Sequence, residues 1–268
     1  MVDQKNTEKI VDKEDINSSN SNKSGFEALV ENVFRRFQTV GFMVFLFPIT
    51  IIYIICIATA LTPGFLLFNW ASPIVADYSM LAKAFSYGLC VGGGFVGFVF
   101  TLIFIVPLMN LPFLPFVKAY RGAWFSIESI PWYYHNALTY LVRYTILDFL
   151  TPSPFNVLFY KMMGMKVGKG VMINSSNISD PCLIKLDDYV TIGGSAYMMA
   201  HYGMKGFLII DKLHIKRGAM VGLSAKILGG VTIGEKAVVA PNSTVLPKTI
   251  IKDGEKYGLG PQQSSQAS

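Results

Sequence analysis

Aliphatic residues return at every sixth position in the C-terminal half of the chain. The regular series comprises Ile209, Ile215, Val221, Ile227, Ile233, Val239 and Val245. Four places after most of its members stands a small residue: Ala219, Ala225, Val231, Ala237 and Ser243. A period of six belongs neither to an α-helix nor to an alternating strand, and it is typical of a parallel β-helix. The pattern predicts such a domain over residues 161–262, with about four coils of roughly eighteen residues each.

The rhythm is less regular before this series and is interrupted once. Between Met198 and Ile209 the spacing slips from six to eleven, which predicts a loop that leaves the coil. The first residue of this loop is His201. A histidine at the exit of a repeat strand is a candidate for proton transfer because its ordinary pKa lies near neutrality, and the alternative is a purely structural histidine. The earlier repeat positions are Val167, Ile173, Leu186, Ile192 and Met198.

Two uncharged apolar runs precede the repeats. They cover residues 40–61 and 84–107, and each exceeds the roughly 20 residues that span a bilayer as a helix. At 52% hydrophobic and 15% charged residues, the chain is also more apolar than an ordinary soluble protein. The second run holds two successive Gly-x-x-x-Gly pairs, Gly88–Gly92 and Gly93–Gly97, which favour close helix packing unless they only reflect how common glycine is in membrane helices. We therefore predict a two-helix transmembrane hairpin.

Flanking charges predict the orientation of this hairpin. Arg35 and Arg36 precede the first run and Lys118 and Arg121 follow the second, whereas the intervening loop offers Lys83. Positively charged flanks stay in the cytoplasm. We expect an integral protein of the cell membrane, without a cleavable signal, whose termini and β-helix are both cytoplasmic.

The remaining segments fall into three kinds. Residues 1–24 and 263–268 are polar tails, and the first is expected to be disordered. Residues 25–118 comprise an amphipathic helix followed by the hairpin. Residues 119–160 form an aromatic connector beside the membrane, and an interfacial helix pair is expected there because His135, Arg143 and Asp148 exclude a third span. The apolar positions of the amphipathic helix are Phe26, Leu29, Val30, Val33, Phe34 and Phe37.

The charge and the metal-ligating residues narrow the set of partners. From Lys161 onward thirteen Lys or Arg residues stand against seven Asp or Glu residues. This surplus would suit anionic membrane lipids or a phosphate-bearing substrate, or it is a solvated surface without a ligand. The three cysteines suggest no disulfide framework, and the three histidines, His135, His201 and His214, lack the spacing of a zinc site. We expect no metal and no nucleic-acid partner.

A hexapeptide β-helix in which one histidine leads into a loop resembles the left-handed β-helix acyltransferases. The resemblance implies a left-handed coil and a direct attack of an amine or hydroxyl on the thioester of acyl-CoA. It gives His201 the role of general base and places Gly222 and Leu223 where a backbone N–H faces the developing oxyanion. It also implies that the pantetheine arm lies against the corner formed by Ala240, Asn242 and Ser243.

A second resemblance covers nearly everything after residue 108. Pro152-x-Pro154-Phe155, Pro241-Asn242-Ser243 and Gly258-x-Gly260-Pro261 are similar to the C-terminal membrane and β-helix region of polylysine-synthetase-like nonribosomal peptide synthetases. Those synthetases combine six spans with three β-helix units, and this chain resembles one third of that arrangement. The resemblance implies a homotrimer, amide bond formation and an aminoacyl thioester supplied by a carrier protein.

Two features depart from these patterns. Pro241 has no N–H where CoA-binding relatives have one, and the second polar residue of the active site has no clear equivalent. Asn174 and Asn177 are candidates for it, or they serve only as corner residues. We expect a membrane-bound acyl- or aminoacyltransferase that moves an acyl group from a thioester donor to a small-molecule amine or hydroxyl. The alternative is a non-catalytic trimeric β-helix scaffold that docks partners at the membrane.

Overall fold

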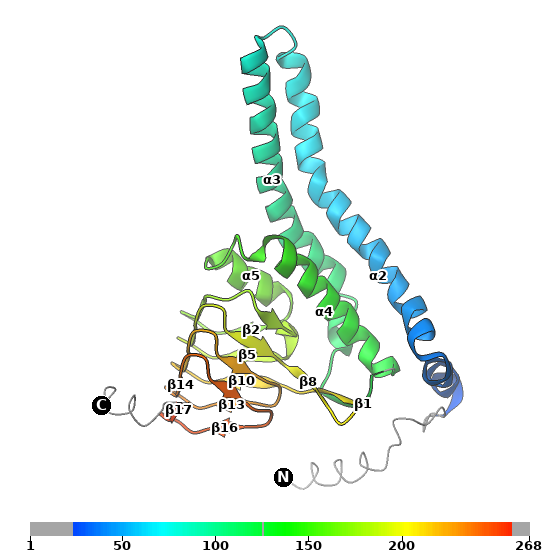
Figure 1. The fold of residues 1–268 in the computed structure, drawn as a ribbon, viewed down its shortest axis with the longest axis vertical. Coiled ribbons are helices and arrows are strands. Elements are labelled where there is room, and N and C mark those ends of the chain that lie inside the picture. The colour runs from blue at the N-terminus through cyan, green and yellow to red at the C-terminus, as the bar shows by residue number, and fades with distance from the viewer. Residues whose placement is uncertain (1–23, 125, 259–268) are drawn as a thin grey trace.

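Two long helices project as a hairpin from a compact C-terminal body (Figure 1). The computed structural model describes residues 24–124 and 126–258, so the predicted tails, apart from Ser24, lie outside the described residues. Helix α2 (Gly25–Ile74) and helix α3 (Met80–Asn110) are joined by a short turn. Both are long and apolar enough to cross a membrane. Each extends past its predicted span, and α2 continues without a break through the predicted amphipathic helix and three prolines.

The two helices touch where glycines remove the side chains between them. A Cβ atom on Gly94 would lie 2.8 Å from the Gly64 Cα atom, and one on Gly97 would lie 2.8 Å from the Pro63 Cβ atom. Neither distance is compatible with a larger residue at these two positions unless the helices move apart. Small residues therefore allow the backbones to approach closely.

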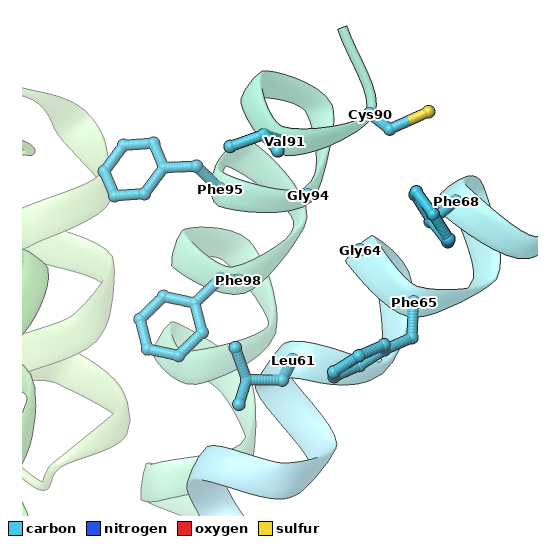
Figure 2. Close-up of a pocket in the computed structure, with 9 residues that line it drawn as sticks. All are labelled: Leu61, Gly64, Phe65, Phe68, Cys90, Val91, Gly94, Phe95 and Phe98. Carbon is cyan, nitrogen blue, oxygen red and sulfur yellow. The ribbon is translucent and has the colours of Figure 1, made fainter. Parts of the chain in front are cut away.

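Only part of the predicted glycine motif serves this contact. Gly93 and Gly97 face α2, whereas a Cβ atom added to Gly88 or Gly92 would meet nothing within 4 Å. Figure 2 shows the open apolar groove that flanks the Gly64–Gly94 contact, with phenylalanines from both helices along it. The groove has a volume of about 620 Å³ and is lined by Leu61, Gly64, Phe65, Phe68, Cys90, Val91, Gly94, Phe95 and Phe98.

The connector forms one strand and two helices. Helix α4 lies between the hairpin and the β-helix in Figure 1. The Tyr53 hydroxyl of α2 donates to the Ala137 carbonyl at 2.6 Å, and the Tyr134 hydroxyl donates to the Phe45 carbonyl at 2.6 Å. The connector thus contains two helices, α4 and α5, and their position at a membrane interface stays a prediction. The connector comprises β1 (Tyr120–Ala123), α4 (Ile130–Val142), a π-helical turn (Arg143–Leu147) and α5 (Pro154–Met162).

The C-terminal body is a left-handed parallel β-helix with three faces. Its strands are two or three residues long, and each pairs in parallel with the strand one coil away. Two faces hold five strands and the third holds four, which makes four complete coils and two strands of a fifth, against about four coils predicted. The irregular early hexads form the first complete coil, β2 to β4.

The strands of the three faces have the following bounds. Face 1 comprises β2 (Lys166–Val167), β5 (Ile184–Leu186), β10 (Leu213–Ile215), β13 (Thr232–Ile233) and β16 (Ile250–Ile251). Face 2 comprises β3 (Met172–Ile173), β6 (Thr191–Ile192), β11 (Met220–Val221), β14 (Val238–Val239) and β17 (Lys256–Tyr257). Face 3 comprises β4 (Ile178–Ser179), β7 (Tyr197–Met199), β12 (Lys226–Ile227) and β15 (Thr244–Val245).

The repeated aliphatic residues fill the interior of the coil, as predicted. Every member of the series after Ile209 is fully buried, and so are Ala219, Ala225 and Ala237 at the corners. Ile209 is an exception to the predicted register, because it belongs to strand β9 outside the coil. The predicted interior positions that the structure confirms are Ile215, Val221, Ile227, Ile233, Val239 and Val245.

The slip in the repeat corresponds to a β-hairpin instead of an irregular loop. Strands β8 (His201–Met204) and β9 (Phe207–Ile210) pair antiparallel, and β9 also pairs antiparallel with β1 of the connector. The protruding segment is thus tied to residues about ninety positions earlier in the chain. This three-stranded sheet sets the direction in which the chain leaves the coil at His201.

Side chains of α5 satisfy backbone carbonyls on the open side of the first coil. Asn156 Nδ2 donates to the Ile173 carbonyl at 2.8 Å, and the Tyr160 hydroxyl donates to the Ser176 carbonyl at 3.1 Å. Both side chains are fully buried. Helix α5 therefore closes the end of the β-helix that faces the hairpin.

Candidate functional site

His201 stands at the corner between face 3 and face 1. It follows the buried Ala200 and is the first residue of strand β8. Its backbone is therefore fixed by the coil on one side and by the β8–β9 hairpin on the other. The side chain is 18% exposed, which leaves one edge of the ring accessible. Its Nδ1 atom lies 2.6 Å from Asp180 Oδ2. The imidazole is thus held by a carboxylate and open to a ligand at the same time.

Asp180 lies one coil earlier, directly after β4, and its carboxylate is fully buried. Oδ1 accepts hydrogen bonds from Trp132 Nε1 at 2.6 Å and Asn136 Nδ2 at 2.7 Å. Oδ2 accepts from the Ala200 amide at 2.9 Å, in addition to its contact with His201. Four partners therefore orient one carboxylate. None of Asp180, Trp132 and Asn136 was identified as a site residue from the sequence.

This environment determines which nitrogen of His201 is available. Burial would raise the pKa of Asp180, but the hydrogen bond and charge of His201, followed by the hydrogen bond from Trp132, outweigh it and hold the pKa below its ordinary value. An ionised carboxylate can only accept, so the proton of a neutral His201 resides on Nδ1. Nε2 then carries the free lone pair, which is the arrangement required of a general base.

Two further residues shape the space around His201. The Trp132 indole meets the imidazole edge-on, with ring centroids 4.9 Å apart and an interplanar angle of 68°. Beneath the histidine, a Cβ atom added to Gly229 would come within 3.0 Å of the Ala200 carbonyl group. Trp132 therefore fixes the ring from the α4 side, and Gly229 leaves room for the chain at the corner.

A second histidine, which is fully buried, links this site to the helical hairpin of α2 and α3. His135 on α4 is completely buried, and its Nδ1 atom lies 3.1 Å from the Oδ1 atom of Asn110, the last residue of α3. Burial lowers the pKa of His135 to about 4, against the opposing charge of Asp180. His135 is therefore neutral near pH 7. Through α4, the hairpin and the carboxylate partner of His201 belong to one packed unit.

Other chemistry near the carboxylate is disfavoured. Burial, followed by the charge of Asp180, raises the pKa of the Cys182 thiol to about 12, so a thiolate nucleophile is not available there. Within residues 24–124 and 126–258, no group of three or more His, Cys, Asp or Glu side chains is placed to hold a metal ion.

The two asparagines predicted as polar partners lie elsewhere. The Oδ1 atom of Asn177 accepts from Arg143 Nη2 at 2.5 Å, and Asn174 is exposed at the end of β3. The side chain that contacts His201 is Asp180. Neither asparagine is among the hydrogen-bond partners of His201, whose carboxylate partner Asp180 lies one coil earlier, and a catalytic role for Asn174 or Asn177 stays a prediction.

Gly222 and Leu223 stand at the corner between face 2 and face 3. The Gly222 amide donates to the Val239 carbonyl at 2.9 Å, so it is engaged within the coil and is a poor oxyanion donor. The Leu223 carbonyl accepts from the Asn242 amide at 2.8 Å, and the Leu223 side chain is exposed. Among the described backbone hydrogen bonds the Leu223 amide has no acceptor. Of the two residues, Leu223 therefore remains the candidate whose backbone N–H group would stabilise the oxyanion.

At the corner predicted to hold the pantetheine arm, the backbone N–H groups are likewise already hydrogen-bonded within the coil. The Ala240 amide donates to the Tyr257 carbonyl at 2.9 Å, and the Ser243 amide donates to the Ala240 carbonyl at 3.3 Å. The Asn242 amide is engaged as described above, and Pro241 has none. Any hold on a donor at this corner would therefore come from side chains and not from backbone N–H groups.

His214 belongs to a separate surface pair. Its Nε2 atom lies 2.8 Å from Asp187 Oδ2, on the outer side of face 1. Slight burial would raise the pKa of Asp187, but hydrogen bonds from Lys185 and His214 lower it overall. Both members of the pair are partly exposed. The chain therefore contains a second His–Asp pair that can serve as an internal reference.

The fold and site define a hexapeptide-repeat β-helix that carries a His–Asp pair next to an apolar helical hairpin. No protein-family model matches the chain. Over 114 residues, 42% of the chain, it is 27% identical to the delta-poly-L-ornithine synthetase of Acinetobacter baumannii, of which the match covers 9%.

Among solved structures, the hexapeptide-repeat acetyltransferase of Vibrio cholerae in complex with acetyl coenzyme A is similar, with 17% identity and a TM-score of 0.33 over 47% of this chain and 85% of that one. The serine acetyltransferase of Neisseria gonorrhoeae in complex with serine has 17% identity and a TM-score of 0.27, over 46% of this chain and 53% of the enzyme. The chain thus spans about half of that enzyme. The comparisons return both groups that the sequence motifs indicated.

Proposed function

We propose that this chain is a membrane-bound acyl- or aminoacyltransferase in which His201 is the general base. The observation that carries the proposal is the 2.6 Å contact between His201 Nδ1 and the buried Asp180 carboxylate. It orients the imidazole and leaves Nε2 free at a partly open surface. A positioned base of this kind accelerates proton transfer by roughly 10²–10⁴-fold.

The reaction follows from this geometry. His201 Nε2 takes a proton from the acceptor amine or hydroxyl. At the same time the nitrogen or oxygen of the acceptor attacks the thioester carbonyl. A tetrahedral intermediate forms, and its oxyanion is stabilised by a backbone N–H group, for which Leu223 is our candidate. Collapse of the intermediate breaks the carbon–sulfur bond. The imidazolium then returns its proton to the departing thiolate, which leaves an amide or ester and a free thiol.

The donor is a thioester, carried by CoA or by a carrier protein, and an amine is the acceptor we favour. The name of the Acinetobacter relative describes a polymer of ornithine, and this supports amide bond formation here. Acetyl coenzyme A is the first donor to test, since the similar Vibrio enzyme was solved with it.

The site requires a second copy of the chain. His201 and Leu223 stand at opposite ends of face 3, so one chain cannot bring both to one thioester. We propose a homotrimer in which His201 of one subunit faces the Leu223 corner of the next, with six membrane spans in all. We also propose that the β-helix is cytoplasmic, which the positively charged flanks of the hairpin support.

Thioester turnover by the full-length protein in membranes tests the proposal. Acetyl coenzyme A and an aminoacyl N-acetylcysteamine thioester, which mimics a carrier-bound donor, are supplied with an amine, and free thiol is measured. His201→Ala should lower turnover by about 10²–10⁴-fold. His214→Ala is the matched control and should behave as the wild type. Full activity of His201→Ala would refute the mechanism, and absence of turnover in the wild type would favour the scaffold alternative.

The assembly has its own measurement. Native mass spectrometry in detergent should give three times the monomer mass of 29.6 kDa. A monomer with full activity would show that each site is complete within one chain.

A further inference from the structure

One side of α4 contacts the first coil of the β-helix along its whole length. Trp132 and Asn136 reach Asp180 as described, and the Tyr140 hydroxyl lies 3.0 Å from Ser179 Oγ. One turn further on, Arg143 reaches Asn177. The first three contacts end on neutral groups or on the buried carboxylate. The last one leaves a cation with most of its donors free.

The Arg143 guanidinium is fixed by aromatic rings instead of by a carboxylate. Its central carbon lies 5.5, 5.2 and 5.9 Å from the ring centroids of Tyr140, Tyr144 and Tyr197. Within the described part of the chain, it makes one side-chain hydrogen bond, to Asn177, and no ion pair within 4.0 Å. Asp148, on the same connector, bonds to Ser176 instead. Arginine has five donors, so several remain for a ligand.

A second cation lies next to the same tyrosine. Lys226 on β12 is in register with Tyr197 on β7, and both side chains point away from the core while Met198 and Ile227 fill it. Strands in register lie about 4.8 Å apart, so Lys226 and Arg143 flank Tyr197 on the outer side of face 3. Among the described residues Lys226 makes no ion pair. Two cations that form no ion pair among the described residues thus share one surface.

We propose that this surface, formed by Arg143, Tyr197 and Lys226, binds a carboxylate or phosphate group of the acyl acceptor. Ala200 lies three positions after Tyr197, and a rise of about 3.3 Å per residue puts the start of the His201 corner about 10 Å from the anion. The claim that this anion belongs to the acyl acceptor rests on the proposed function. The claim that the surface binds an anion does not. A planar guanidinium held by rings is well suited to a carboxylate or phosphate.

The test uses two acceptors that differ in one group. A chain of about eight bonds spans 10 Å, so the amine and carboxylate of 8-aminooctanoate fit the two ends of the site. In 8-aminooctanamide an uncharged amide replaces the carboxylate. Binding is read as the shift in melting temperature of the detergent-solubilised full-length protein, and transfer is read as kcat/KM for each acceptor. The ratio of the two acceptors is compared within each variant, so a general loss of activity cancels.

The wild type should prefer 8-aminooctanoate by about tenfold to a hundredfold, and bind it more tightly by the same factor. Arg143→Gln should reduce the ratio to near one, and Lys226→Glu should reverse it. Arg217→Gln is the matched control, because Arg217 also lies over a tyrosine, Tyr189, but on another face. Its ratio should match that of the wild type.

The outcomes separate the two proposals. Preferential binding without thioester turnover would refute the transferase and keep the anion site. Turnover that depends on His201, with equal use of both acceptors in the wild type, would refute the anion site alone. A preference that survives in Lys226→Glu would also refute it, and since Lys226 is exposed this variant should fold.

Vesicles distinguish a soluble anion from a lipid headgroup. The protein is reconstituted in phosphatidylcholine, with or without phosphatidylglycerol. A preference for 8-aminooctanoate that persists in both supports a soluble acceptor at this surface. A preference that phosphatidylglycerol abolishes in the wild type and in Arg217→Gln alike would show that a lipid headgroup occupies this surface, and would refute the soluble acceptor. Loss in the wild type alone would show that the lipid acts through Arg217, and would overturn the site.

Discussion

Replacing Asp180 by asparagine removes a negative charge but keeps the size of the side chain. The carboxylate accepts from two groups at each oxygen, and the Trp132 indole and the Ala200 amide can only donate. Whichever way the new amide turns, its NH₂ group faces one of these donors. If that group faces His201, the imidazole must accept through Nδ1 and carry its proton on Nε2. The base is then lost.

The magnitude follows from these contacts. One buried N–H without an acceptor costs about 1–3 kcal/mol, and the hydrogen bonds that remain lose the contribution of the charge. We expect Asp180→Asn to lower the free energy of unfolding by about 2–4 kcal/mol. Turnover should fall by about 10²–10⁴-fold, because the wrong tautomer disables the base as fully as its removal.

The stability difference should depend on pH in one direction. The pKa of Asp180 is lower in the folded protein than in the unfolded chain. Its stabilising effect is therefore complete above the ordinary aspartate pKa of about 3.9 and is lost as the pH falls through the lower folded value. The gap in unfolding free energy between wild type and Asp180→Asn should narrow below about pH 4.

Urea unfolding followed by tryptophan fluorescence, with thioester turnover on the same samples, measures both effects. Asp187→Asn is the matched control because Asp187 pairs with His214 on another face. At this partly exposed position we expect a change within about 0.5 kcal/mol and no loss of turnover. Normal turnover in Asp180→Asn, or an equal loss in the control, would refute the assigned pairing of His201.

Three further predictions address the rest of the molecule. As the pH falls from 6.5 to about 4, the wild type should lose about 3 kcal/mol of its free energy of unfolding, because His135 is protonated in the unfolded chain but stays neutral when buried. The free energy of unfolding of His135→Gln, measured in urea, should lack this pH dependence. Ile227→Asp places an unpaired carboxylate in the core and should unfold the β-helix, so a native circular dichroism spectrum would contradict the register. In a background without native cysteines, Ala76→Cys, in the exposed turn between the two helices, should react from outside the cell and Ser268→Cys only after permeabilisation; the reverse pattern would overturn the topology.

The six-residue periodicity of the sequence was sufficient to predict which aliphatic side chains form the core of the β-helix. The aliphatic positions from Ile215 to Val245 are buried because each hexad turns its aliphatic side chain into the coil, a local rule that can be read without a structure. Ile209 obeys the spacing by coincidence. It lies six residues before Ile215, but the chain there pairs antiparallel with β1, and no local pattern indicates a partner so distant in sequence.

The polar site was harder to predict because its parts are far apart in the chain. Trp132 and Asn136 are 48 and 44 residues from Asp180, and they belong to a connector whose aromatic content indicated a membrane interface. One signal was present. Asp180 precedes His201 by about the length of one coil, and residues one coil apart stack. A search for acidic residues at that spacing would have favoured Asp180 over both asparagines.

Helix α5 has a consequence for how the chain behaves when it is cut. The first coil presents a row of strand edges toward the hairpin, and an uncovered edge is a template for another chain. Asn156 and Tyr160 occupy carbonyl groups on that edge. A fragment that begins at Lys161 would keep every repeat and yet expose this edge. We expect it to stack end to end into fibrils or to aggregate, since repeat arrays remain soluble only when their terminal units are capped.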